Sequence, residues 1–405
     1  MKKTTFHMIT GLLAVVLVFG INRAHAQAGS LDTTFGKGGT VTANLGVTAT
    51  TLTAIEQSNG DIAVVTGLNK TGFPNVETFA LIRYTSTGTR LSTTTASFFT
   101  NGINAPAAVA VQSNGDIVVA GTASSGIDQS GEFALARFLP TGKLDTTFGQ
   151  GGLVTTLPTG GFPTVSALLV QPNGQILIAG SADSGLKKVQ SPTILVRYNS
   201  NGSLDPAFGA GGIVEEPTPV LAPSAMAQLS DGSYLVAAGA SSAQFSSTGV
   251  LQSTVTPEPI VASNPSSPFS EAIVFQPNGD FVEAAIVGNG FQKTAGELFR
   301  FSETAVVDST FLSTKFTFGE QKQNQPAAIA LQSNGQFVVG GGCGLARVDS
   351  DGVLDTAFGT GGSLATTFGI SGVLIQTDGN IVVVGGHENS QTGVTTLSVQ
   401  RYLGN

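Results

Sequence analysis

The stretch VSALLVQPNGQILIAG, residues 165–180, decides the fold because it is one copy of a unit that recurs along the chain. In its middle, Asn173-Gly174 separates two apolar runs. This pattern predicts a tight β-hairpin in which both turn residues adopt positive φ. Seven such turns occur, at Asn59-Gly60, Asn114-Gly115, Asn173-Gly174, Asp231-Gly232, Asn278-Gly279, Asn334-Gly335 and Asp378-Gly379. Repeats of this length indicate a propeller, solenoid or array.

Each unit continues with two further candidate strands. The first run after the turn is continuously apolar, as in QILIAG (175–180), which is typical of a strand buried on both faces. A third strand such as TILVRY (193–198) follows a variable loop, and we expect LDPAFG (204–209) to be the fourth. Four strands in each of seven units predict an all-β, seven-bladed propeller of four-stranded antiparallel blades.

The two ends of the chain complement each other. The segment GSLDTTFG (29–36) has no third strand before it, and RYLGN (401–405) has no fourth strand after it. Joined, they reproduce a complete unit such as RYNSNGSLDPAFG (197–209). We therefore expect the N-terminal strand to complete the last blade and close the ring, with 397–402 pairing antiparallel to 30–35.

Residues 1–26 resemble a secretory signal peptide. Lys2 and Lys3 precede an apolar run, and a small-x-small cleavage site ends at Ala26. The propeller domain is then 27–405, and we expect it to be extracytoplasmic, either periplasmic or secreted. Because Cys343 is the only cysteine, no internal disulfide can form.

The charge of the mature chain limits its partners. Without residues 1–26, 15 Lys and Arg stand against 26 Asp and Glu, a net charge of −11. Nucleic acids and anionic membranes prefer basic patches, so we expect neither nucleic-acid binding nor membrane insertion. An unknown protein or glycan ligand remains, and we expect a monomer without a cofactor.

The run LDxxFGxGG, followed by AxxxQxNGxIVVAG and AR[YF], resembles the delta-60 repeat of exported bacterial proteins and, more loosely, the blades of NHL-repeat propellers. The resemblance covers essentially all of residues 29–405. It implies a β-propeller and is silent about activity.

An arginine recurs in the third strand, and an aspartate follows it eight residues later. Because the two residues flank a hairpin turn, we expect them to form structural cross-strand pairs. The pairs are Arg137 with Asp145, Arg197 with Asp205, Arg300 with Asp308, Arg347 with Asp355 and, across the closed ring, Arg401 with Asp32. Arg83 has Ser92 near the Asp position, and one unit has Gln244 and Gln252 instead of both charges. We expect recurrent phenylalanines, among them Phe148 and Phe208, to anchor neighbouring blades.

No catalytic or metal-binding motif is apparent. After cleavage His387 is the only histidine, and Glu56 and Glu271 are the only charged residues on the first strands. We predict no turnover that depends on His387. The loops between the second and third strands are the candidate binding surface, because loops on a rigid scaffold concentrate binding residues. Candidates are Asp128, Asp183, Lys187, Lys188, His387 and Glu388.

These observations favour an exported binding or interaction module. The alternative is an extracytoplasmic enzyme, a hydrolase or lyase acting on polysaccharide, with its site at the mouth of the central channel. A cluster of convergent polar residues in one pocket would distinguish the two.

Overall fold

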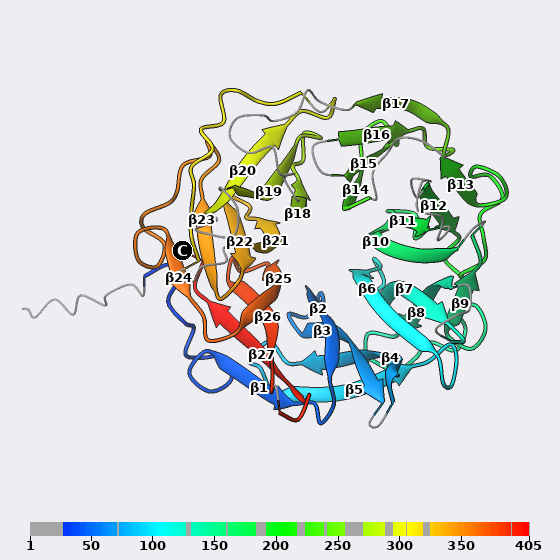
Figure 1. Cartoon of the computed structure of the whole chain (residues 1–405), viewed down its shortest axis with the longest axis horizontal. Coiled ribbons are helices and arrows are strands. Elements are labelled where there is room, and N and C mark those ends of the chain that lie inside the picture. Colours follow the sequence, from blue (N-terminus) through cyan, green and yellow to red (C-terminus); the bar gives the residue numbers. More distant parts are fainter. Residues whose placement is uncertain are drawn as a thin grey trace, which may run out of the picture.

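The computed structural model describes residues 27–70, 73–126, 131–158, 161–183, 192–216, 223–238, 241–255, 270–287, 295–304, 306–318, 325–389 and 391–404. Within these ranges 27 strands form seven antiparallel sheets, which stand as blades around a central axis (Figure 1). The predicted seven-bladed, all-β propeller is therefore confirmed.

Each blade is given from the axis outward. Blade 1 consists of β2 (Ala49–Glu56), β3 (Ile62–Lys70), β4 (Phe73–Tyr84) and β5 (Arg90–Ala96). Blade 2 consists of β6 (Ile103–Val111), β7 (Ile117–Ser124), β8 (Glu132–Phe138) and β9 (Leu153–Thr156). Blade 3 consists of β10 (Phe162–Val170), β11 (Ile176–Asp183), β12 (Thr193–Tyr198) and β13 (Ile213–Glu216). Blades 4 and 5 are β14 (Ala225–Gln228), β15 (Tyr234–Ala238), β16 (Ser241–Phe245) and β17 (Leu251–Val255); β18 (Ser270–Phe275), β19 (Phe281–Val287) and β20 (Ala295–Phe301). Blades 6 and 7 are β21 (Pro326–Leu331), β22 (Phe337–Gly341), β23 (Gly344–Val348) and β24 (Ser363–Ala365); β25 (Gly369–Ile375), β26 (Ile381–Glu388), β27 (Thr395–Tyr402) and β1 (Thr40–Asn44).

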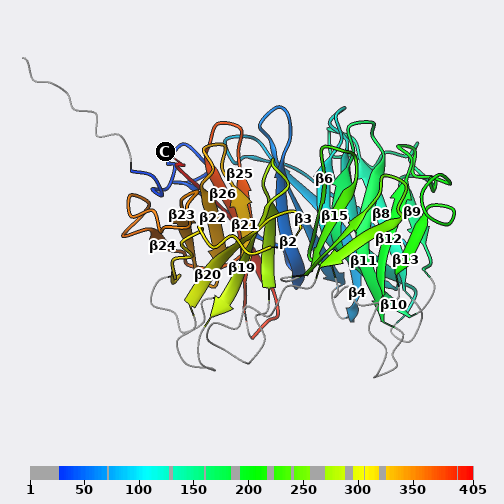
Figure 2. The same cartoon turned by 90° about the horizontal axis from the view of Figure 1, so that it is seen from above.

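The ring has two faces, seen edge-on in Figure 2. The seven hairpins between first and second strands lie on one of them, which we call the Asn-Gly face. Because neighbouring strands are antiparallel, the first strands begin and the second strands end on the opposite face, the connection face.

The hairpins differ from the expected two-residue turn. In blade 3 the amide of Gly174 donates to the carbonyl of Gln171, and Gln171 in turn donates to the carbonyl of Gln175. Gly174 has φ +83°, whereas Asn173 is not at positive φ. This is a three-residue loop with only its glycine in the left-handed region, which is another common hairpin connection.

The prediction that the motif LDxxFG is the fourth strand is wrong. The motif forms a turn that precedes the fourth strand. In blade 3, Leu204 makes a single bridge to Tyr198, and the strand β13 begins only at Ile213. Between them Gly209, Gly211 and Gly212 have φ of +52°, +68° and +105°. Glycines at positive φ interrupt an extended strand, so the outer strand starts after them.

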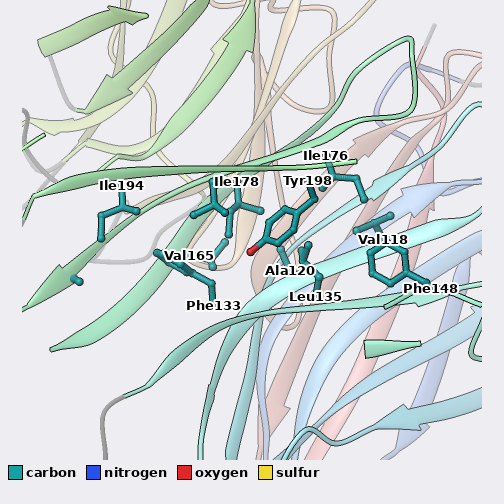
Figure 3. Packing of buried hydrophobic residues seen from close by; sticks show 12 residues of the cluster. Val118, Ala120, Phe133, Leu135, Phe148, Val165, Ile176, Ile178, Ile194 and Tyr198 are labelled. Carbon is teal, nitrogen blue, oxygen red and sulfur yellow. The ribbon is translucent and has the colours of Figure 1, made fainter. Parts of the chain in front are cut away.

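The core lies between the blades. Phe148 of blade 2 is fully buried and packs with Tyr198 and Ile176 of blade 3 (Figure 3). The other recurrent phenylalanines also pack against the next blade: Phe35, Phe208, Phe311 and Phe358. The predicted aromatic anchors are thus confirmed.

The N-terminal strand closes the ring, as predicted, but in a shifted position. The strand that pairs with β27 is β1, with Thr42 opposite Ser398. Within the expected segment, pairing is limited to an antiparallel bridge between Leu31 and Tyr402. The amide of Asp32 donates to the Arg401 carbonyl, 2.8 Å, and that of Leu403 to the Ser30 carbonyl, 2.9 Å; just before it, the Gly29 amide donates to the Leu403 carbonyl, 2.8 Å. Joining the two ends also predicts that Asn405 and Gly29 lie close together, but Asn405 is outside the described ranges.

Blade 5 departs most from the repeat. Its sheet has three strands in the described ranges, and Phe316 makes only an isolated bridge to Gly296 where other blades have an outer strand. Blade 4 keeps four strands but lacks the FGxGG turn, so that β17 begins directly after its hairpin.

Candidate functional site

A β-bulge recurs at the same place in the innermost strands. In blade 3 the register skips Ser166 between Val165 and Ala167. Six of the seven innermost strands contain this irregularity, and the skipped residues are Thr50 and Thr51, Ala107, Ser166, Glu271, Ala327 and Ser371. We call them the bulge ring. Bulges redirect side chains and are over-represented beside functional sites.

The bulge ring lies toward the connection face, because in β2, β18, β21 and β25 the bulge is within the first three residues of the strand; in β6 and β10 it is at the middle residue. Three of its members, Thr50, Ala327 and Ser371, are exposed, and Ser166 and Ala107 are half-buried. Ser371 is exposed between the buried residues Ile370 and Gly372, and Ala327 is exposed beside buried Pro326. Apart from Glu271, whose side chain lies outside the described part of the chain, the members are small residues, and their hydroxyl groups offer hydrogen bonds rather than acid–base chemistry.

A buried carboxyl group lies next to this ring. Glu77 on β4 is 7% exposed, and its Oε1 accepts a hydrogen bond from the hydroxyl of Thr50. The carboxyl occupies space that a side chain at Gly67 would fill. Burial raises the pKa of Glu77, and the hydrogen bond from Thr50 offsets this only in part. The sequence contained no periodic signal for this residue, because no other blade repeats it.

The raised pKa of Glu77 predicts a pH-dependent stability. A carboxyl whose pKa is higher in the folded state contributes stability that is present below its unfolded pKa and lost as the pH rises through the folded value. We expect Glu77→Gln to unfold at a higher temperature than the parent protein at pH 7, with the difference shrinking toward pH 4. Thermal unfolding from pH 4 to pH 8 measures this. Glu388→Gln, which changes an exposed carboxylate, is the control, and a difference for Glu77→Gln that is independent of pH would contradict the prediction.

The predicted binding residues are only partly within the described ranges. Asp128, Lys187 and Lys188 lie outside them, as does the side chain of Asp183, the last residue of β11. His387 and Glu388 are exposed at the end of β26, where His387 lies opposite Thr396. These two residues and Asp183 end second strands and therefore lie on the connection face.

The predicted arginine–aspartate pairs are present in all five blades. Nitrogen–oxygen distances are 2.7 Å for Arg137–Asp145, 2.8 Å for Arg197–Asp205, 2.5 Å for Arg300–Asp308, 2.7 Å for Arg347–Asp355 and 2.7 Å for Arg401–Asp32. Each guanidinium also stacks on the phenylalanine of its own blade, as Arg197 does on Phe208 at 4.5 Å.

Each of these arginines also reaches the next blade. Arg197 Nη1 donates to the carbonyl of Ser247, 2.5 Å, and Arg300 Nη1 donates to that of Ser350, 2.9 Å. The acceptor occupies the same repeat position in the turn after the third strand in every case. The remaining donors and acceptors are Arg137 and Ser200, Arg347 and Gly404, and Arg401 and Ser86. We call each such contact an arginine clasp.

The two exceptions have local explanations. In blade 1, where Ser92 replaces the usual aspartate, Arg83 pairs at 2.9 Å with Asp61, which follows the Asn-Gly turn, and donates to the carbonyl of Thr141. In blade 4 the side chain of Gln244 donates to the hydroxyl of Ser233, 3.1 Å. Ser233 holds the repeat position of Asp61, so blade 4 replaces both charges with a neutral hydrogen bond.

The aspartates of the clasps are held ionised. Burial alone would raise the pKa of Asp205, but the backbone amide of Ala207 and the Arg197 guanidinium outweigh it and lower the pKa. Hydrogen bonds from Thr310, assisted by Arg300, lower the pKa of Asp308 to about 2. Each guanidinium therefore faces a carboxylate at neutral pH, as a stable ion pair requires.

Glu56 is part of a contact between blades. Its carboxylate accepts hydrogen bonds from the side chain of Gln376, 2.9 Å, and the amide of Thr377, 2.8 Å, both in blade 7. The side chain of Glu271 lies outside the described part of the chain.

Two further properties concern the described residues alone. No group of three or more His, Cys, Asp or Glu is arranged there to hold a metal ion. None of the elements described has the length and apolar character of a membrane-spanning helix.

Solved structures of similar shape share little sequence with this chain. A protein of unknown function from Bacteroides caccae is 14% identical, with TM-score 0.41, and the match covers 78% of this chain and 97% of that one. An alpha-L-arabinanase from Penicillium chrysogenum, complexed with arabinobiose, is 13% identical, with TM-score 0.47, and the match covers 92% of this chain and 96% of the arabinanase. The calcium-binding protein regucalcin from Agrobacterium tumefaciens is 12% identical, with TM-score 0.39 and coverage of 89% and 92%.

No curated protein sequence matches the chain. A family model described as "Domain of unknown function (DUF5122) beta-propeller" matches residues 112–148 and 171–208. Each matched segment runs from the glutamine before the Asn-Gly turn to the phenylalanine that packs between blades. The match and the ring of repeated blades together support a β-propeller repeat family.

Proposed function

We propose that the protein is a binding module whose ligand site is on the connection face, around the bulge ring. The observation that carries this proposal is the repetition of the bulge in six innermost strands, with exposed side chains at Thr50, Ala327 and Ser371. A bulge costs regular pairing in every one of these strands. Its recurrence around one face of a rigid ring fits a surface used for recognition.

The chemistry of the bulge ring favours a neutral, hydroxyl-rich ligand. Thr50, Ser166 and Ser371 can each donate and accept hydrogen bonds, Ala107 and Ala327 carry only a methyl group, and Glu271 is the one charged member. A glycan offers matching hydroxyl groups, whereas an anionic polymer would meet a chain with a net charge of −11 after cleavage. A protein ligand is the other outcome that a binding test can return.

We further propose that the chain is exported, with residues 1–26 removed near Ala26, and acts as a monomer. The basic start, apolar run and small-residue site support export. The repeated LDxxFGxGG and QxNG motifs support assignment to the delta-60 repeat family. Mass spectrometry of the protein recovered from the cell envelope, together with light scattering, would test cleavage and oligomeric state.

The binding proposal predicts that bulky charges on the bulge ring abolish ligand binding. We expect the purified protein to bind neutral glycans on an array, and Ala327→Arg/Ser371→Arg to reduce that signal at least tenfold. Both residues are exposed, so the fold should survive and thermal unfolding should change little.

Ser58→Arg adds a charge on the Asn-Gly face and is the matched control. Equal glycan binding by the bulge-ring variant and the parent protein would show that the binding site is not at the bulge ring. If the protein instead hydrolysed a glycan and His387→Ala abolished that activity, the enzyme alternative would replace this proposal.

A further inference from the structure

A small pocket lies between blades 4 and 5 on the Asn-Gly face. Its volume is about 190 Å³, and its wall includes Leu229 and Ser230 of blade 4 and Gln276, Asn278, Gly279 and Glu303 of blade 5. With about 30 Å³ for each water molecule, the pocket has room for about six waters or one small organic group.

The same repeat positions form a pocket between blades 2 and 3. That pocket, of about 390 Å³, includes Gln112 and Ser113, and Asn173, Gly174 and Ser200. By their positions in the repeat unit, these residues correspond, in the same order, to Leu229, Ser230, Asn278, Gly279 and Glu303. Arg137 lines the pocket between blades 2 and 3, where its Nη1 donates a hydrogen bond to the Ser200 carbonyl. The pocket between blades 4 and 5 is therefore the equivalent place without an arginine.

The arginine is missing because blade 4 has Gln244 at its position. The shorter side chain of Gln244 turns back to Ser233 within its own blade. At five other junctions the guanidinium donates to the carbonyl of the residue that corresponds to Glu303. In the described part of the chain no arginine or lysine lines the pocket between blades 4 and 5.

Several groups around the pocket are hydrogen-bond acceptors. Glu303 brings a carboxylate to it, and its Oε2 lies above Gly279, 3.1 Å from the place of a Cβ there. The Oε1 atom of Gln276 is buried without a hydrogen-bond partner, as are those of the equivalent Gln171, Gln332 and Gln376, so this free acceptor is a property of the repeat and does not result from the missing arginine. Asp231 follows Ser230 but is not part of the pocket wall; its pKa is lowered by hydrogen bonds from Ser233, so it adds a negative charge nearby. Neither Glu303 nor Asp231 forms an ion pair among the described residues.

We propose that this pocket binds an alkylguanidinium group supplied by another molecule, in place of the arginine that blade 4 lacks. A planar guanidinium presents five donors, which suit a carboxylate, an amide oxygen and a backbone carbonyl arranged around one site. The group can come from a free small molecule or from an arginine side chain of a partner peptide. This site is on the face opposite the bulge ring, so it is independent of the function proposed above.

The first test compares a cation with its neutral analogue. n-Butylguanidinium and n-butylurea have similar shape, and only the first carries a charge. We expect n-butylguanidinium to shift the amide NMR signals of Gly279 and Glu303 in a saturable way, with n-butylurea binding at least tenfold more weakly. Equal binding of both compounds, or no binding of either, would overturn the proposal.

Two variants then locate the site. Glu303→Gln keeps the shape of the side chain but removes its charge, and we expect it to weaken n-butylguanidinium binding at least tenfold. Asp351→Asn removes an exposed carboxylate from the same face outside the pocket, and it should leave binding unchanged. Equal losses in both variants would indicate general charge attraction and would refute a defined site.

A repair variant provides the sharpest control. Ser233→Asp/Gln244→Arg copies the Arg83–Asp61 pair of blade 1, whose third and fourth strands have the same bulge as those of blade 4. The new arginine should place its guanidinium on the Glu303 carbonyl, raise the unfolding temperature and abolish n-butylguanidinium binding. If the variant is folded and still binds n-butylguanidinium as the parent does, the pocket is not the vacant arginine place.

The source of the group is decided by a further comparison. Agmatine and the blocked peptide acetyl-Gly-Arg-Gly-amide carry the same alkylguanidinium. Equal affinities would assign the pocket to small cations, whereas at least tenfold tighter binding of the peptide would assign it to a partner protein. Failure of both to compete with n-butylguanidinium would contradict the proposal.

Discussion

Arg197→Ala is expected to reduce the free energy of unfolding by about 3–5 kcal/mol, the cost of breaking a buried ion pair on one side. The guanidinium bonds to Asp205 at 2.8 Å, to the Tyr234 hydroxyl at 3.1 Å and to the Ser247 carbonyl at 2.5 Å. Asp205 is only 6% exposed, so the variant leaves a carboxylate without its partner in a poorly hydrated place. Urea-induced unfolding measures the loss.

Blade 4 supplies the matched control for this prediction. Gln244 occupies the position of Arg197 but makes a neutral hydrogen bond within its own blade. Removing a neutral partner costs about 1 kcal/mol, so Gln244→Ala should be several-fold milder than Arg197→Ala. Arg197→Ala/Asp205→Ala should recover part of the loss, because no lone carboxylate remains. If Arg197→Ala and Gln244→Ala had equal effects, the clasp would not be a structural ion pair.

Sequence spacing predicted this contact because a hairpin turn fixes which residues face each other. Eight residues from Arg197 to Asp205 are enough to leave one strand and return beside it. The partner of Arg83 could not be predicted in this way. Asp61 is on the other neighbouring strand, 22 residues away, and only the folded blade shows that it takes the place of the missing aspartate.

The error in the fourth strand has a physical cause. The apolar residues of LDPAFG (204–209) suggested a strand, but in the structure the residues of this motif have separate roles. Phe208 is buried between blades, and Asp205 accepts the amide of Ala207 as a turn residue does. The glycines that follow have positive φ in the structure, and this backbone conformation makes the segment a turn. The outer strands are only three to seven residues long and carry little periodic signal.

The bulge ring could not be predicted from the sequence. Ser166, Ala107 and Ser371 are ordinary small residues inside apolar runs, and a bulge depends on how two strands pair. Glu77 gave no signal either, since its burial depends on the space at Gly67 and on a threonine from another strand. Repeat patterns show what all blades share, whereas these features depend on pairing or on a single blade.

Deleting residues 27–44 is expected to unfold the protein or nearly so, far beyond the usual effect of trimming a terminus. The deletion removes β1 and leaves β27 with an unpaired edge. It also removes Phe35, which is fully buried against blade 1, and Asp32, the partner of buried Arg401. Each loss acts on the junction between blades 7 and 1. Calorimetry on the truncated chain is the measurement, and a cooperative transition near that of the parent would contradict this account of closure.

A crosslink tests the same closure in a protein that still folds. Thr42 and Ser398 are opposite each other on β1 and β27, and Ala134 and Thr155 hold the same repeat positions within blade 2. Thr42→Cys/Ser398→Cys would join residues 356 positions apart, whereas Ala134→Cys/Thr155→Cys would join residues only 21 apart. Because the entropy removed from the unfolded chain grows with the logarithm of loop length, the first disulfide should stabilise by about 2.5 kcal/mol more than the second. The comparison is made between oxidised and reduced forms of each variant, which cancels the cost of the substitutions themselves. Equal gains would mean that the ends of the ring separate without unfolding the blades, so that β1 would not hold the propeller closed.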